Sequence, residues 1–429
     1  MQSVAIAAAL VVAYGTVSRR LTTTVVTGPM AFVAAGLLLG DGGLEVLDLG
    51  LEEEGVRILA EATLVLVLFV DAIAIDVRAL VREIQLPARL LTIGLPLTVV
   101  LGTGAALLVF DMQLWEAALL AAILAPTDAA LGQAVVTNPR VPERIRQTLS
   151  VESGLNDGIV LPLVMLFLGL AAEETMAVSG RSIATFVASQ LGFGVLTGVA
   201  VGLVGGIVID RAARSEWMDG VFRQLSVFAV AVCSFAVADL VGGNGFIAAF
   251  VAGVTFGQVA REQCQGAADF AEDEGQLLTL LTFLVFGAAL AGPALADAPQ
   301  PQTAVYAVLS LTIVRVVPTA VALAGTGLTV TSKAFIGWFG PRGLASILFS
   351  VLILEEADLP TQDAIIQIVT WTVLLSILAH GASARPAADA YGRHATTIRS
   401  DAAEHVPAAS TRHGADPSAP GSGTRPGDG

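Results

Sequence analysis

The amino-acid sequence predicts an all-α polytopic membrane protein with about thirteen transmembrane helices. Hydrophobic residues make up 55% of the 429 residues and charged residues 14%, whereas an average soluble domain holds roughly 25% charged residues. Uninterrupted apolar stretches of about 20 residues recur along nearly the whole chain, and an α-helix of that length crosses the hydrocarbon core of a bilayer. The stretches are continuous and do not alternate with polar residues, which excludes a transmembrane β-barrel.

These apolar stretches give the positions of the expected spans. The first has no basic residue before it and is followed by Arg19 and Arg20, the reverse of a secretory signal peptide. We therefore expect it to be retained with the N-terminus outside, and an odd number of spans then places the C-terminus in the cytoplasm. The expected spans lie near 2–18, 25–40, 57–75, 89–110, 115–135, 148–171, 183–209, 221–240, 243–259, 276–292, 302–325, 331–354 and 363–384.

The distribution of basic residues supports this topology. Thirteen cations lie in loops expected to be cytoplasmic and two, Arg57 and Arg181, in loops expected to be outside, as the positive-inside rule requires. The outer loops are instead acidic over 41–55 and 355–363, which either concentrates cations near an entrance or only solvates loop surface. The net charge of −15 gives no indication of a nucleic-acid partner. The thirteen cations are Arg19, Arg20, Arg78, Arg82, Arg89, Arg140, Arg144, Arg146, Arg211, Arg214, Arg223, Arg261 and Lys333.

A few ionisable side chains fall at membrane depth, where each costs several kcal/mol and usually faces a cavity or a partner. Acids outnumber bases among them, and an acidic excess in a dry interior suits a cation or protons. These deep residues are Asp71, Asp128, Glu152, Asp157, Arg315 and Arg342.

Two of the expected spans contain helix-breaking residues. In "ILAPTDAALGQA" the ring of Pro126 disfavours helix and frees carbonyl groups around 125–127. In "IGWFGPRGLAS" Pro341 and two glycines do the same around Arg342. One broken helix in each half of the chain is typical of an inverted-repeat secondary transporter with its site at the midplane. Kinks used only for packing are the alternative, but each of these kinks carries an ionisable residue.

Between the two broken helices lies "TLSVESGLNDGIV" (148–160), which is polar although apolar runs flank it. On a helix Ser153, Asn156 and Asp157 share one face, while Glu152 stands about 100° away from Ser153. The only intramembrane counter-charges for Glu152 are the two deep arginines, and unpaired it would be costly.

Five short motifs together carry a family resemblance. "PTDAAL", "VESGLNDG", "GNGFIAAFVAGVTFG", "IVRVVP" and "FGPRG" resemble, in this order, the sodium/proton exchangers of the NhaP/NHE branch of the cation/proton antiporters. The likeness runs over roughly residues 5–385. It implies an NhaA-like inverted-repeat fold with two broken helices, working as a homodimer in the bilayer of the plasma membrane.

The resemblance also implies the activity and the domain organisation. A secondary antiporter exchanges Na⁺ or another monovalent cation for H⁺ by elevator-type alternating access, and it is neither an enzyme nor dependent on a cofactor beyond the transported ions. The transmembrane exchanger domain is expected over 1–385. Its parts are core helices at 89–171 and 302–384, dimerisation helices at 2–75 and 221–292, and a linking helix at 183–209.

The family's functional residues carry over onto matching positions. Asn156 and Asp157 match its Asn-Asp pair, with Asp157 as the carboxylate that binds the ion and the proton. Thr127 offers a backbone carbonyl and Asp128 supports the site, although the familiar Thr-Asp-Pro is Thr-Asp-Ala here. Ser153 matches a hydroxyl ligand, so the resemblance implies that the transported Na⁺ is held by Asp157, Asp128, Ser153 and Thr127.

Two further assignments come from the same resemblance. Glu152 and Arg342 are expected to form a structural ion bridge, and Asp71 in "LFVDAIAID" falls near the expected ion pathway.

Asn156 does not titrate near neutral pH, which leaves one titrating carboxylate in the motif and predicts electroneutral one-for-one exchange. Oxygen ligands of this kind suit Na⁺, K⁺ and Li⁺ alike, so the motif does not select the cation.

Two other functions were weighed against exchange. An anion or organic-acid transporter of similar broken-helix fold would need basic residues at the site, and the acidic excess argues against it. An intramembrane aspartyl protease using Asp71 and Asp157 would need Gly-x-Gly-Asp, whereas "GLNDG" lacks the second glycine.

The composition changes after about residue 385. The segment 386–429 is rich in Ala, Pro, Gly and Ser, and from this composition we predict a disordered cytoplasmic tail. Within the membrane region, glycines recur every four residues along 183–209, which predicts either close packing of a neighbouring helix or a sliding surface. Gly253 and Gly257 repeat the pattern and are candidates for a dimer interface.

Overall fold

The structure is a computed structural model, and it describes residues 2–21, 24–40, 42–47, 54–73, 85–176, 180–260, 275–296, 299–356, 359–399 and 402–406. These residues form helices and connecting turns, with no β-strand among them, which confirms the all-α prediction. The helices are α1 (Gln2–Leu21), α2 (Gly28–Leu39), α3 (Glu54–Ile73), α5 (Gln85–Arg89), η1 (Leu90–Gly94), α6 (Leu95–Val109), α7 (Leu114–Ile123), α8 (Gln133–Val136), α9 (Glu143–Met176), α10 (Gly180–Arg214), α11 (Gly220–Leu240), α12 (Gly245–Val259), η2 (Phe286–Ala291), α14 (Gly292–Ala296), α15 (Pro301–Leu311), α16 (Ile313–Ala322), α17 (Val330–Trp338), α18 (Leu344–Glu356), α19 (Gln362–Ala395) and η3 (Ala403–His405).

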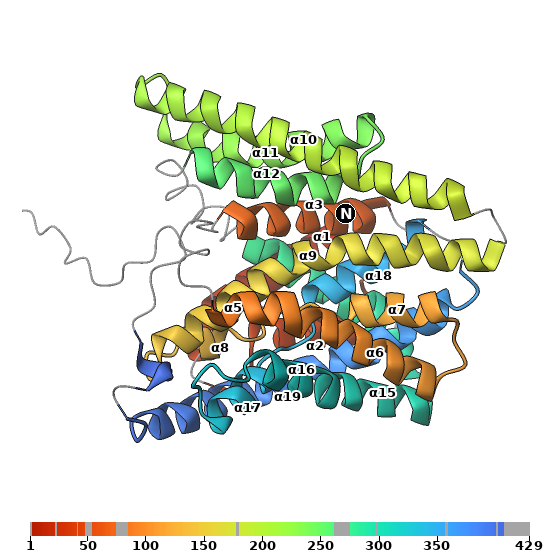
Figure 1. The fold of residues 1–429 in the computed structure, drawn as a ribbon, viewed down its shortest axis with the longest axis vertical. Coiled ribbons are helices and arrows are strands. Elements are labelled where there is room, and N and C mark those ends of the chain that lie inside the picture. The colour runs from red at the N-terminus through yellow and green to blue at the C-terminus, as the bar shows by residue number, and fades with distance from the viewer. Residues whose placement is uncertain are drawn as a thin grey trace, which may run out of the picture.

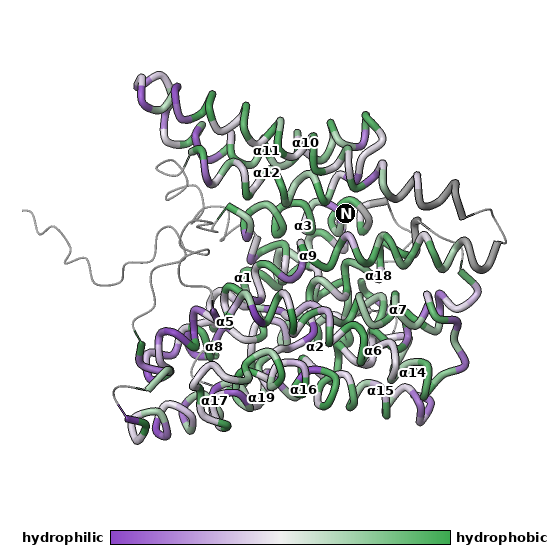
Figure 2. The backbone as a smooth tube through the Cα atoms, viewed as in Figure 1, coloured by the Kyte–Doolittle hydropathy of each residue, from purple (hydrophilic) through white to green (hydrophobic). Residues whose placement is uncertain are grey.

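Many of these helices are built to cross a membrane. Hydrophobic residues dominate the helix bodies, and hydrophilic residues gather towards the helix ends (Figure 2). In the described part of the chain, eight helices are long and apolar enough to span a bilayer: Gln2–Leu21, Gln85–Val109, Glu143–Ala172, Ala188–Arg214, Gly220–Leu240, Gly275–Ala296, Pro301–Ala322 and Gln362–Ala395. Shorter apolar helices lie at Gly28–Leu39, Leu114–Ile123, Gly245–Val259 and Leu344–Ile353. The expected spans all fall on helical segments, while the count of thirteen crossings stays a prediction.

The helices pack in a layered bundle (Figure 1). Helices α10, α11 and α12 pack together along one side, and α12 also packs against α3. Helix α9 runs past α3 and α12 on one side and α7 on the other, so the polar motif lies in the middle of the bundle. Helices α6, α15, α16, α17 and α19 lie beyond it.

The glycines of α10 serve close packing. A Cβ at Gly198 would lie 2.6 Å from Ala248 O, and one at Gly202 would lie 2.5 Å from Ala252 O, so only glycine lets α12 approach this closely. Gly253 and Gly257 of α12 face the backbone of α3 in the same way. Their contact is therefore inside the protomer, and the suggestion that they form a dimer interface is wrong.

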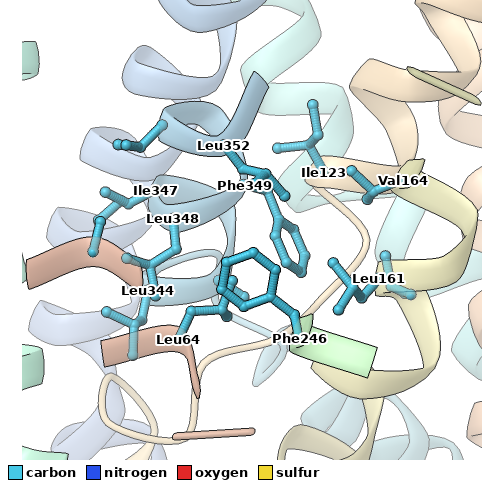
Figure 3. Packing of buried hydrophobic residues seen from close by; sticks show 14 of the residues in the cluster. Leu64, Ile123, Leu161, Val164, Phe246, Leu344, Ile347, Leu348, Phe349 and Leu352 are labelled. Carbon is cyan, nitrogen blue, oxygen red and sulfur yellow. The ribbon is translucent and has the colours of Figure 1, made fainter. Parts of the chain in front are cut away.

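A packed apolar cluster joins α18 to its neighbours (Figure 3). Phe349 of α18 and Leu161 of α9 are completely buried in it, and Ile123 at the end of α7 packs beside them. Leu64 of α3 and Phe246 of α12 reach the same cluster from the opposite side. The cluster therefore holds α9 and α18, which carry the polar motif and part of a broken helix, against the α3–α12 side of the bundle.

The prediction of a disordered tail beginning at residue 386 is wrong for its first part. Helix α19 continues to Ala395, and η3 follows at Ala403–His405. The overall composition of this segment does not reveal its helical periodicity, in which buried apolar residues recur three or four positions apart. These residues are Ala384, Ala388, Tyr391 and Ala395. Several of them pack in one cluster with residues of α17. The remainder of the predicted tail, 407–429, lies outside the described residues.

Candidate functional site

The two predicted broken helices are present, and they cross. The first is α7 and α8, separated by the non-helical residues 124–132, and the second is α17 and α18, separated by 339–343. At the crossing, the N–H of Asp128 donates to the carbonyl oxygen of Pro341 at 2.8 Å. This bond joins the two breaks directly, which places the midpoints of both interrupted helices side by side.

Asp128 is bound at the start of α18. Its Oδ2 accepts from the N–H of Leu344 at 2.8 Å, and its Oδ1 accepts from the N–H of Ala130 at 2.7 Å. A carboxylate at a helix N-terminus is stabilised by the unsatisfied N–H groups and by the positive end of the helix dipole. Gly343 is required here, because a Cβ at that position would overlap the Asp128 carboxylate. Asp128 is therefore an anchor of the second broken helix.

Arg342 fills the complementary position at the end of α7. Its side chain is completely buried, and Nη1 donates to the carbonyl oxygens of Ala125 at 2.6 Å and Pro126 at 3.1 Å. A cation at a helix C-terminus is stabilised by the free carbonyls and the negative end of the dipole. The backbone N–H of Arg342 donates to Ser376 Oγ on α19 at 2.7 Å. Asp128 of the first break therefore lies at the N-terminus of α18, and Arg342 of the second break lies at the C-terminus of α7. In both places the side-chain charge is opposite to the charge of the helix dipole at that end.

The polar motif of α9 faces the first break. Asn156 Nδ2 donates to Thr127 Oγ1 at 2.6 Å, and Thr127 Oγ1 lies 3.0 Å from Ser153 Oγ in a hydroxyl–hydroxyl hydrogen bond. The predicted shared face of Ser153, Asn156 and Asp157 is therefore brought against Thr127. All four side chains are buried.

Two buried oxygens of this network have no hydrogen-bond partner, Oδ1 of Asp157 and Oδ1 of Asn156. Asp157 is 8% exposed, and of the two residues it is the one with a carboxylate. Asp128 and the partly buried Asp71, near the end of α3, lie close enough for their negative charges to act on it. The structure thus gathers the predicted acids around one carboxylate whose bonding capacity is unused.

The predicted bridge between Glu152 and Arg342 is wrong, because Glu152 pairs with Arg315. The guanidinium of Arg315, on α16, binds Glu152 through two parallel bonds, Nη1 to Oε1 at 2.6 Å and Nη2 to Oε2 at 2.8 Å. Both side chains are 4% exposed. Arg342 is already turned towards the carbonyls at the end of α7. Arg315 also lies against Gly340, where a Cβ would overlap its Nε, so the bridge joins α9 to α16 beside the second break.

Two serines at this centre were not foreseen. Ser376 accepts from the backbone of Arg342, and Ser346 Oγ of α18 donates to Ile123 O at the end of α7 at 2.7 Å. Each side chain satisfies a backbone group that a helix interruption leaves without a partner. A serine within an apolar helix is too common to indicate such a role from sequence.

The fold and this site define a membrane protein of the broken-helix transporter architecture. Residues 6–390 match the sequence profile of the family described as sodium/hydrogen exchanger, transmembrane, and the chain belongs to that family. This confirms the family resemblance of the five motifs.

Similar proteins include antiporters from distant organisms. The K(+)/H(+) antiporter NhaP of Alkalimonas amylolytica is 25% identical over 361 residues, which cover 84% of this chain and 61% of that protein. A probable Na(+)/H(+) antiporter of Schizosaccharomyces pombe is 24% identical over 62% of this chain and 39% of its own length. The chain therefore spans less than two thirds of the length of these relatives. The structure of the sodium proton antiporter MjNhaP1 from Methanocaldococcus jannaschii at pH 8 has the same fold, with a TM-score of 0.74 at 20% identity, covering 90% of this chain and 98% of that one.

Proposed function

We propose that this protein is a secondary antiporter that exchanges a monovalent cation for H⁺ across the plasma membrane. The observation that carries the proposal is Asp157, a buried carboxylate whose Oδ1 has no partner, beside two broken helices whose charges are compensated. An unpaired carboxylate at membrane depth is costly. Binding either a proton or a cation removes that cost, so the two ions compete for one group.

The groups around Asp157 suit a small hard cation. Its carboxylate, the Ser153 and Thr127 oxygens and the Asp128 carboxylate provide oxygen ligands of the kind that alkali cations take. Asn156 holds Thr127 in place through the hydrogen bond at 2.6 Å. We assign Asp71 to the lining of the ion pathway. The cycle uses no cofactor and no enzymatic step.

One-for-one, electroneutral exchange follows from the bonding of the neighbouring groups. Asn156 neither takes up nor releases a proton in this range. Asp128 accepts a backbone N–H on each oxygen, so both of its oxygens are already engaged in anchoring the second broken helix. Asp157 is then the one group that exchanges an ion. Its bare anion does not cross the apolar interior, so a proton or a cation accompanies each passage.

We further propose that exchange proceeds by elevator-type movement within a homodimer. The core helices at 89–171 and 302–384 carry the site and move past the helices at 2–75 and 221–292, with 183–209 as the link. The N-terminus lies outside and the C-terminus in the cytoplasm, as the arginine distribution predicts. Helix α1 has no buried residue, which leaves its apolar surface for lipid or a second protomer.

Anion or organic-acid transport is less well supported by the same site. The basic group nearest the crossing, Arg342, directs Nη1 to the carbonyls of Ala125 and Pro126. Arg315 is paired with Glu152. The unpartnered oxygens at this centre belong to the Asp157 carboxylate and the Asn156 amide, and both favour a cationic substrate over an anionic one.

The test is cation-dependent collapse of a pH gradient in proteoliposomes containing the purified full chain. Addition of Na⁺, K⁺ or Li⁺ outside acid-loaded vesicles is expected to raise the internal pH, and choline is expected to have no effect. Collapse driven by an organic acid with choline as the only cation would contradict the proposal. So would the absence of collapse with all three alkali cations.

A further inference from the structure

A short segment after α19 is anchored at the end of the molecule where α17 begins. We name residues 402–406 the strap; its central element is η3 (Ala403–His405). Glu404 of the strap is 1% exposed. Its Oε1 accepts from the N–H of Thr329 at 2.8 Å and from the hydroxyl of Ser332 at 2.7 Å. Thr329 is the N-cap residue of α17, so the strap places a carboxylate at the N-terminus of that helix.

The strap also contacts two other helices. The guanidinium Nη1 of Arg144, in the first turn of α9, donates to the carbonyl oxygen of Ala403. His405 Nε2 of the strap lies 3.2 Å from the carbonyl oxygen of Ala395 at the end of α19, in a hydrogen bond. Tyr391 of α19 also bonds Ser332, the residue that Glu404 binds, at 2.8 Å. Figure 1 shows the end of α19 together with α17 and α8 at this end of the bundle. The strap therefore joins α9, α17 and α19, and it lies beyond the residues 6–390 that match the family.

Glu404 acts here as a charged group. Burial works to raise the pKa of the Glu404 carboxyl, but the hydrogen bonds from Thr329 and Ser332 outweigh it and hold the pKa below its ordinary value. The carboxylate is ionised at neutral pH, and its stabilising effect is lost only as the pH falls through that lowered value. A negative charge at a helix N-terminus stabilises the helix through the dipole and the free N–H groups.

Each of the three helices joined by the strap leads to a part of the candidate site. Helix α17 ends at Trp338, directly before the break that contains Pro341 and Arg342. Helix α9 carries Asp157, and α19 provides Ser376, which binds the backbone of Arg342. Because α17 has only 9 residues, a displacement of its N-terminus is transmitted along less than three turns to the break.

We propose that Glu404 is a positioning residue for the site: by capping α17 and fastening it to α9 and α19, it fixes the 339–343 break against Asp128 and Asp157. The transport measurement below rests on the proposed exchange function. The structural measurement does not depend on that function.

The structural test uses hydrogen–deuterium exchange of the detergent-purified full chain. Glu404→Ala removes the acceptor of the Thr329 N–H and of the Ser332 hydroxyl, while the Thr329 side chain still caps α17 at the Ser332 N–H. It is expected to speed amide exchange in α17 and in 339–343 by about 5- to 30-fold, the factor that corresponds to a loss of about 1–2 kcal/mol for unsatisfied donors. Glu404→Gln keeps the shape and one acceptor, so it folds more readily, and it is expected to give a smaller change. The matched control is Glu143→Gln, an exposed acid at the start of α9, which is expected to change neither segment.

The transport test compares the same variants in proteoliposomes. The cation concentration that gives half-maximal exchange is expected to rise several-fold in Glu404→Ala, less in Glu404→Gln, and not at all in Glu143→Gln. A merely stabilising role would lower the amount of folded protein without moving this concentration. Unchanged exchange of 339–343, or an unchanged half-maximal concentration at full folding, would overturn the proposal. If the wild-type chain transports no cation, the proposed function fails, while the deuterium measurement still decides the positioning role.

Discussion

Asp128 and Asp157 are buried to nearly the same extent, at 9% and 8% exposure, yet their surroundings are opposite. Asp128 accepts a backbone N–H on each carboxylate oxygen, and its own N–H binds the other broken helix. Asp157 Oδ1 accepts none. Burial alone therefore does not separate the two roles that we propose, support of the break for Asp128 and ion binding for Asp157. The proposal rests on the different bonding of the two carboxylates.

The two deep arginines also have partners in the surrounding protein. Arg315 is neutralised by a bidentate pair with Glu152, while Arg342 is held by the carbonyl groups that a broken helix exposes. Asp128, Arg315, Glu152 and Arg342 thus each have a structural partner. Oδ1 of Asp157 has no such partner, and we therefore propose Asp157 as the acid whose charge an incoming ion neutralises.

The largest effect is expected for Asp157→Asn. The amide keeps the shape of the side chain but does not exchange a proton, so cation-driven proton movement should fall to the level of protein-free vesicles. Thermal unfolding in detergent should change little, because Oδ1 makes no hydrogen bond to be lost. Substantial exchange by this variant would show that another group carries the ion.

The next largest effect concerns stability at the Glu152–Arg315 pair. Glu152→Ala leaves Arg315 buried without its partner and is expected to destabilise the fold by about 3–5 kcal/mol. Adding Arg315→Ala should recover part of that loss, since no uncompensated charge remains. The control double variant, Glu152→Ala with Arg342→Ala, should recover none. Simple additivity of the Glu152 and Arg315 losses in denaturation experiments would contradict the pairing.

Asp128→Asn is expected to have an intermediate effect, and it sharpens the contrast with Asp157. The amide retains one acceptor and directs an NH₂ group at either Leu344 N–H or Ala130 N–H, leaving a buried donor unsatisfied at about 1–3 kcal/mol. The melting temperature should therefore fall in this variant and not in Asp157→Asn. Equal melting temperatures for the two would remove the distinction between them.

The smallest effect is expected for Ser153→Ala. It removes one hydroxyl bond to Thr127, worth about 0.5–1.5 kcal/mol. The concentration of cation for half-maximal exchange should rise a few-fold, while the maximal rate changes less because Asp157 is intact. A rate that falls to background would show that Ser153 is more than one ligand among several.

The membrane fold and the centre of the site could be predicted because their signals are local. Apolar length gives the helices, Pro126 and Pro341 give the breaks, and helical spacing brings Ser153, Asn156 and Asp157 to one face. The partner of Glu152 is a matter of tertiary packing. Both arginines satisfied the charge requirement, and only the packing of α16 against Gly340 decides between them.

The strap shows a second limit of sequence reasoning. The composition of 386–429 indicates disorder, but an average over the whole segment does not register the few residues that make tertiary contacts. Tyr391 and Glu404 are 13 positions apart, and each bonds Ser332. Such contacts depend on where α19 ends relative to α17, which no local pattern contains. The glycines at 198 and 202 differ from the strap, because their spacing already indicated either close packing or a sliding surface, and the structure shows close packing against α12.

The central claim, that Asp157 alone exchanges the ion, is tested most directly by the charge moved in each cycle. Proteoliposomes are held at a chosen membrane potential by a gradient of the permeant anion thiocyanate, because K⁺ is itself a candidate substrate, and the Na⁺ gradient that just balances a fixed pH gradient is measured. With one carboxylate exchanging one Na⁺ for one H⁺, no net charge moves, and the balance point should not depend on the potential. A second titrating acid would move charge, at about 2.3 kcal/mol per charge per 100 mV. A balance point that shifts with the imposed potential would therefore contradict the claim and assign a second proton to Asp71 or Asp128.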